Sequence, residues 1–185
     1  MVMPALLDGR DWTIVDLDLL PDDDGNKYEI IDGVLYVSPP PGWPHTFVSH
    51  DLYALIHEYL RGKSLGIAVF PRAGIKRTER TWVEPDFFVL PLVEGRRPTS
   101  GDDLVPLLVV EVISPSSRRR DRGVKRALYQ RIGTGEYWIV DSYRKAIEVW
   151  SPDARLPRIA NDRLTWKPSA ECAPLEIDIA ALFAR

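Results

Sequence analysis

The chain has 185 residues, of which 45% are hydrophobic and 28% are charged. This length and balance fit a single globular domain over residues 1–185 and exclude a disordered chain. No apolar run reaches the roughly 20 residues that span a bilayer, and residues 1–7 lack the basic region of a signal peptide. The single cysteine, Cys172, excludes an internal disulfide. We therefore expect a cytoplasmic protein that does not contact membranes.

The net charge of -3 does not indicate a strongly basic nucleic-acid binder. The charge is unevenly distributed, because residues 1–60 hold two basic residues against eleven acidic ones, whereas residues 61–185 hold 22 basic against 16 acidic. The densest basic stretch is residues 118–131. Such a stretch fits a phosphate ligand, and it fits a solvated helix surface equally well.

The first part of the chain predicts a hairpin and a long helix. Residues 11–20 alternate apolar and acidic side chains, which predicts a short helix or turn. Two β-prone runs, residues 28–31 and 34–37, flank Asp-Gly, the strongest short signal for a β-hairpin. Apolar residues then recur at steps of three and four from His45 to Leu60, which predicts an amphipathic helix.

Shorter strands are predicted next. Residues 67–70 and 74–76 predict strands around a turn, and residues 83–90 predict one further strand that a proline closes. Residues 91–106 have the composition of a loop. Residues 107–113 form an apolar run that one carboxylate interrupts, which is typical of a strand buried on both faces.

The last part predicts a helix over residues 120–132, which Ser116 or Ser117 could cap. Strands are then expected at residues 136–141, 146–150 and 164–166, with a short strand and helix within 177–183. This order predicts an α/β (α+β) fold: a mixed central β-sheet flanked by helices, with an N-terminal β-hairpin.

Two carboxylates stand where the pattern predicts strands. Glu111 lies inside the apolar run, and a buried, unpaired carboxylate is so costly that it needs a partner. Asp86 precedes four apolar residues. If the two strands are neighbours, both acids could bind one Mg²⁺ ion. Two alternatives stay open, namely a buried ion pair between Glu111 and Lys125, and an Asp86 that caps a turn.

Two further charged residues have a structural and a functional interpretation. Glu29 lies between Tyr28 and Ile30 and, taken alone, predicts an outward-facing strand position. Lys125 follows the strand of Glu111, with Tyr129 on the same helical face. It fits a solvated helix face, and it also fits a cation near a scissile phosphate.

Together these residues resemble a known family. Pro85-Asp86, followed after 24 residues by Glu111-Val112-Ile113, resembles the PD-(D/E)XK nuclease signature. The surrounding sequence resembles the Uma-type restriction endonucleases, from about residue 12 to the C-terminus. The motifs that carry this resemblance are Y-E-I-I-D-G at 28–33, S-P-P-P-G-W-P-H at 38–45, E-V-I-S-P-S-S at 111–117, K-x-x-x-Y at 125–129 and G-x-G-E-Y-W-I-V-D at 133–141.

The resemblance implies a restriction-endonuclease-like core, a divalent metal (Mg²⁺ or Mn²⁺) and hydrolysis of nucleic-acid phosphodiester bonds, with DNA as the expected partner. It implies that Asp86 and Glu111 are catalytic metal ligands and that Glu29 is an accessory catalytic acid. Ile113 stands where the general signature has lysine. The resemblance implies that Lys125 supplies the catalytic lysine from the following helix instead.

The basic stretch would then hold the phosphates on either side of the cleaved bond. A packing or capping role is an open alternative for His45, which begins the long helix. The residues that we predict to contact the substrate are Arg118, Arg119, Arg122, Tyr129 and His45.

Three functions remain open: a metal-dependent endonuclease, a nuclease-fold module that binds nucleic acid or protein with little or no catalysis, and a hydrolase of another phosphate ester. Serine catalysis is disfavoured, because no G-x-S-x-G elbow surrounds Ser114, Ser116 or Ser117 and no histidine follows them.

The substrate preference and the oligomeric state are also open. Nucleases of the type that this chain resembles often form homodimers. Trp12, Trp43 and Trp150 are expected to be exposed and could lie at such an interface, whereas Trp82 and Trp166 could equally belong to the core.

Overall fold

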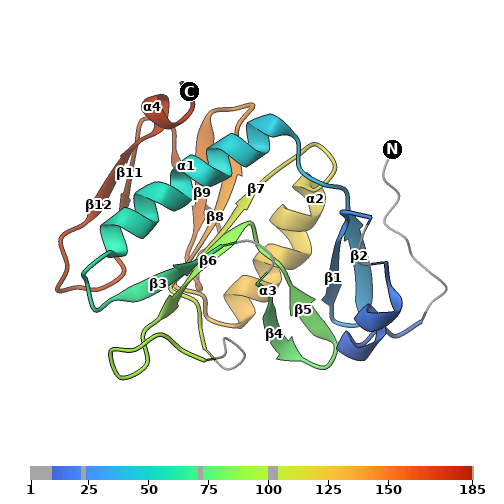
Figure 1. Cartoon of the computed structure of the whole chain (residues 1–185). Helices are drawn as coiled ribbons and strands as arrows, with labels where there is room; N and C mark the ends of the chain where they lie inside the picture. Colours follow the sequence, from blue (N-terminus) through green and yellow to red (C-terminus); the bar gives the residue numbers. More distant parts are fainter. Residues whose placement is uncertain (1–9, 22–23, 71–72, 100–103, 185) are drawn as a thin grey trace.

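A computed structural model describes residues 10–21, 24–70, 73–99 and 104–184. Its centre is a six-stranded sheet in the order β10-β9-β8-β7-β6-β3 (Figure 1). β7 and β8 run parallel, whereas the other neighbouring pairs are antiparallel, so the predicted mixed sheet is confirmed. The six strands are β3 Gly66–Val69, β6 Phe87–Pro91, β7 Leu108–Val112, β8 Glu136–Asp141, β9 Ala146–Trp150 and β10 Arg158–Ala160.

A second sheet of four strands, in the order β2-β1-β5-β4, contains the predicted hairpin. Asp32 and Gly33 join β1 to β2 with φ angles of 52° and 83°, the two consecutive positive values that a tight hairpin turn requires. The 3₁₀ helix Ile14–Leu19 confirms the short helix or turn predicted within residues 11–20, and the strands predicted near residues 164–166 and 177–183 form a two-stranded sheet of β11 and β12. The strands of these two sheets are β1 Lys27–Ile31, β2 Val34–Ser38, β4 Ile75–Thr78, β5 Thr81–Val83, β11 Arg163–Trp166 and β12 Leu175–Asp178.

The single strand predicted over residues 83–90 is wrong. β5 belongs to the four-stranded sheet and β6 to the six-stranded sheet, and the chain leaves one for the other at Glu84-Pro85-Asp86. A proline ends a strand well, because it has no N–H for the hydrogen-bond ladder. The strands predicted around a turn at residues 67–70 and 74–76 do not pair with each other, because β3 belongs to the six-stranded sheet and β4 to the four-stranded sheet. The break places Asp86 at the junction of the two sheets.

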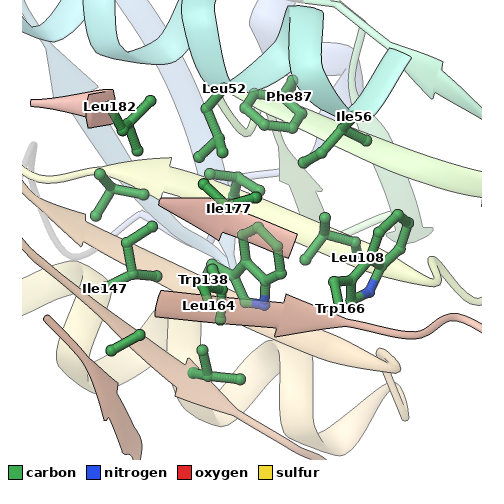
Figure 2. Close-up of a cluster of buried hydrophobic side chains, with 14 of the residues drawn as sticks. Leu52, Ile56, Phe87, Leu108, Trp138, Ile147, Leu164, Trp166, Ile177 and Leu182 are labelled. Atoms are coloured by element: carbon green, nitrogen blue, oxygen red, sulfur yellow. The ribbon is translucent and has the colours of Figure 1, made fainter. Parts of the chain in front are cut away.

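Helices cover both faces of the six-stranded sheet (Figure 1). α1, Trp43–Leu60, packs Leu52 and Ile56 onto one face, in a core that includes Phe87 and Trp138 (Figure 2). A second core on the opposite face includes Leu128, which belongs to a helical rod of three consecutive segments. The segments of the rod are α2 Arg118–Arg120, the π-helical η2 Asp121–Lys125 and α3 Arg126–Arg131. A separate short helix, α4 Ile179–Leu182, follows β12.

The helix predicted over residues 120–132 is therefore present, but it contains a π-helical turn that no sequence signal predicted. Ser117 precedes the rod without making a side-chain capping bond. On β7, Val110 and Val112 pack into the core under α1, whereas Val109 packs into the core on the other face. Because side chains alternate along a strand, Glu111 points toward the helical rod.

Two of the three tryptophans expected at the surface are buried. Trp12 packs with Ile30 and Leu35 of the hairpin, and Trp150 lies in the core beneath the helical rod. Trp43 is 75% exposed, whereas Trp166 is a core residue. The homodimer stays a prediction, with Trp43 as the one remaining tryptophan of that group at the surface. Within the described residues, no helix is long and apolar enough to cross a membrane.

Candidate functional site

A cavity of about 830 Å³ opens at the junction of the two sheets. It is lined by the loop after β2, the start of α1, the break between β5 and β6, and the loop that precedes the helical rod. Asp86 and Glu111 both line it. β6 and β7 are antiparallel neighbours in which Phe87 pairs with Val110, so the two acids occupy the next facing positions. The condition under which both acids could bind one ion, that their strands are neighbours, is therefore met.

Asp86 is held in place by two donors. The backbone N–H of Val112 donates to its Oδ2 at 2.7 Å, and His45 Nε2 lies 2.9 Å from the same oxygen. Oδ1 accepts no hydrogen bond from the residues that the structure describes, and it faces the Lys27 ammonium at 3.7 Å.

Glu111 is held on its other oxygen. Lys125 Nζ donates to Oε1 at 2.6 Å, and the Tyr129 hydroxyl donates to the same oxygen at 3.4 Å. Oε2 lies 3.9 Å from Lys27 Nζ and accepts no hydrogen bond in the described part of the chain. Asp86 and Glu111 therefore each direct one oxygen toward the same ammonium group.

Lys125 forms a buried ion-pair network rather than a solvated helix face. Its side chain is 0% exposed, and its ammonium contacts Glu29 Oε1 at 2.7 Å as well as Glu111. Glu29 also accepts the backbone N–H of Glu84 at 3.0 Å. The outward-facing position predicted for Glu29 is wrong, because its side chain is fully buried. The alternative of a buried Glu111–Lys125 pair is what the structure contains.

Burial and charge act in opposite directions on the two cavity acids. Burial raises the pKa of Glu111 to about 7, although Lys125 and Lys27 both act to lower it. Burial also raises the pKa of Asp86, but Lys27 and His45 more than offset this, and they hold that pKa at about 2. Burial acts to lower the pKa of Lys27, but Glu29, Glu111 and Asp86 together raise it, so its ammonium stays charged at neutral pH.

The residues fit a metal site of limited protein coordination. No group of three or more His, Cys, Asp or Glu side chains in the described ranges is arranged to hold an ion. Two carboxylate oxygens with no hydrogen bond nevertheless face one positive charge inside a cavity. Mg²⁺ is commonly held by one or two carboxylates together with water and substrate phosphate. Asp86 Oδ1 and Glu111 Oε2 match that ligand set.

The residues predicted to contact the substrate divide into two groups. His45 and Arg119 line the cavity, whereas Arg118, Arg122 and Tyr129 are absent from its lining. Arg122 bonds to Glu148 at 2.7 Å and to Asp141 at 3.2 Å. Tyr129 is fully buried against Glu111. Arg122 is thus half-buried in ion pairs and Tyr129 is buried, so neither lines this cavity, and their contact with substrate stays a prediction.

Of two further cavity residues, Lys27 was missed in the sequence and Arg120 was covered only as part of the basic stretch at residues 118–131. Lys27 lies two positions before Glu29, and the period of two along a strand puts both on one face, so this signal was available. Arg120 reaches the Ser38 hydroxyl at 2.7 Å and lies 3.9 Å from Glu29 Oε2. Its contacts cross from the helical rod to the hairpin, and no local pattern predicts them.

A mixed sheet flanked by helices, with an acid on each of two neighbouring strands at its rim, is the architecture of the restriction-endonuclease-like fold. The family model of Uma2, described as "Putative restriction endonuclease", matches residues 14–180. The chain belongs to the Uma2 family.

A solved structure shares this fold. The crystal structure titled as a "putative nuclease belonging to DUF820" from Anabaena variabilis superposes with a TM-score of 0.76. The match covers 94% of this chain and 98% of that one at 17% sequence identity, so it shows a shared fold. No curated protein sequence matches the chain.

Proposed function

We propose that the chain is a divalent-metal-dependent endonuclease that hydrolyses phosphodiester bonds of nucleic acid, with DNA as its substrate. One observation carries the proposal: Asp86 Oδ1 and Glu111 Oε2 face a common positive charge in a cavity. Uma2 membership supports the same reaction.

The proposed mechanism assigns binding to the two cavity acids and positioning to their neighbours. Asp86 and Glu111 would hold Mg²⁺ or Mn²⁺, and the ion would supply a coordinated water of lowered pKa and polarisation of a phosphoryl oxygen. His45 and the Val112 N–H orient Asp86 by fixing its Oδ2. Lys125 fixes Glu111 Oε1 and is itself held by Glu29, so both act as positioning residues.

Positive side chains supply the affinity for the backbone. Arg119 and Arg120 line the cavity beside the acids. Contacts between such side chains and phosphates give binding energy but carry no sequence information. The proposal therefore specifies a reaction and a site without specifying a recognition sequence.

The test measures cleavage of single- and double-stranded DNA and RNA with Mg²⁺, with Mn²⁺ and with a chelator. We expect metal-dependent cleavage by the wild type and a loss of at least about 100-fold in Asp86→Asn, which keeps the shape but removes the charge. Asp153→Asn is the matched control, since Asp153 is exposed and distant from the cavity lining. Cleavage that survives in Asp86→Asn would exclude this site, and binding without cleavage would favour the interaction module.

His45 gives a second prediction. Residues that orient a metal ligand typically contribute 10- to 100-fold in affinity or activity. We therefore expect His45→Ala to weaken Mn²⁺ binding by about tenfold in a calorimetric titration, with a similar fall in cleavage. His50→Ala is the control, because His50 is exposed and lies outside the cavity lining. Unchanged Mn²⁺ affinity in His45→Ala would show that His45 does not position Asp86.

A further inference from the structure

The two lysines near Glu111 differ in what they can reach. Lys125 is 0% exposed and absent from the cavity lining, and both of its ionic partners are buried carboxylates. Lys27 lines the cavity, and its side chain is 25% exposed. A phosphate in the cavity could therefore meet the ammonium of Lys27 but not that of Lys125.

The Lys27 ammonium lies where a bound cation would act. It faces Asp86 Oδ1 at 3.7 Å and Glu111 Oε2 at 3.9 Å, and it donates to the backbone oxygen of Glu84 at 2.9 Å. Of these three oxygens, only the Glu84 carbonyl accepts a hydrogen bond, and the two carboxylate oxygens are the proposed metal ligands. An ion at the 2.0–2.1 Å that Mg²⁺ takes from its oxygens would lie close to the ammonium, and repulsion between charges a few ångströms apart is strong in a partly buried site.

We propose that Lys27 is a further catalytic residue. Its ammonium pairs with the carboxylates of Asp86 and Glu111 until a divalent cation binds, and it then contacts the substrate phosphate. This inference rests on the proposed function. The backbone of Lys27 stays in β1, and its long side chain lets the ammonium turn into the cavity, which Arg119 and Arg120 also line. A substrate phosphate in the cavity then gives the Lys27 ammonium a negative partner in place of the two carboxylates that bind the cation. Metal and nucleic acid should consequently bind cooperatively.

The experiment measures two quantities on Lys27→Met and Lys27→Gln. The first is Mn²⁺ affinity by calorimetry without nucleic acid, which we expect to increase by about tenfold because the competing ammonium is gone. The second is metal-dependent cleavage, which we expect to fall by at least about tenfold because the phosphate contact is lost. A residue with a merely structural role would not tighten metal binding.

Lys167→Met is the matched control, because Lys167 directly follows β11, is exposed and is absent from the cavity lining, so it should change neither quantity. Thermal melts show whether each variant is folded, and Lys27→Gln replaces Lys27→Met if the latter is not. Unchanged or weaker Mn²⁺ binding, or full cleavage, by a folded Lys27 variant overturns the inference while the proposed function stands. If the wild type shows no metal-dependent cleavage, the proposed function fails, and this inference fails with it.

Discussion

Replacing Lys125 with methionine should lower the free energy of unfolding by about 3–5 kcal/mol, the usual result of removing one partner from a buried ion pair. The substitution nearly preserves volume, so the loss comes from charge. Glu29 and Glu111 both contact the Lys125 ammonium, at 2.7 Å and 2.6 Å, and both are buried. Without it, two carboxylates share a site with too little positive charge. Urea denaturation followed by circular dichroism measures the change.

A double variant separates charge from packing. Lys125→Met combined with Glu29→Gln removes one of the carboxylates left without a partner. We expect the double variant to have a free energy of unfolding at least about 1 kcal/mol above that of Lys125→Met, because the effects of substitutions within one ion-pair network are not additive. Lys167→Met should stay within about 0.5 kcal/mol of the wild type, as exposed substitutions usually do. A Lys125→Met protein as stable as the wild type would show that the network does not stabilise the fold.

Local signals predicted the elements that depend on local chemistry. Asp32-Gly33 predicted the hairpin because both residues adopt the positive φ angles of its turn. The apolar spacing after His45 predicted α1, because one stripe of that helix is buried on the sheet. The apolar run around Glu111 predicted β7, which is buried on both faces. In each case the signal lies within the element itself.

The remaining features depend on contacts between distant segments. The break within residues 83–90 has a local signal in Pro85, but which sheet each part joins depends on distant strands. The burial of Glu29 requires Lys125, which lies 96 positions later in the chain. The engagement of Arg122 requires Glu148 from β9. Pattern and propensity describe neighbours along the chain, so they could not predict these pairs.

The same reasoning explains why the candidate site was predicted in part. Glu111 was identified because a carboxylate in an apolar strand is physically anomalous, whereas Asp86 was paired with it through the resemblance to the PD-(D/E)XK signature. Lys27 was missed because Glu29 was predicted to face outward, so the strand face that the two residues share was taken as solvated. The two acids could be identified from the sequence, whereas the role of Lys27 became clear only from the three-dimensional structure.

The largest effect on activity is expected for Glu111→Gln. We expect cleavage to fall by at least about 1000-fold, more than the 10- to 100-fold typical of residues that only orient a ligand, because the substitution removes a charged metal ligand. The amide oxygen can still accept from Lys125 and Tyr129, so the fold should persist. Cleavage assays and thermal melts on one preparation measure both properties, with the exposed Glu171→Gln as control.

This pair of outcomes distinguishes the two roles that meet at Glu111. Its Oε1 belongs to the buried network of Lys125, whereas its Oε2 faces the cavity. If the network were the main reason for a carboxylate here, Glu111→Gln would destabilise the protein about as strongly as Lys125→Met and would lose activity only through unfolding. If Oε2 binds the metal, Glu111→Gln gives a folded protein without cleavage, whereas Lys125→Met gives an unstable one. A folded and fully active Glu111→Gln protein would contradict the proposed metal ligand directly.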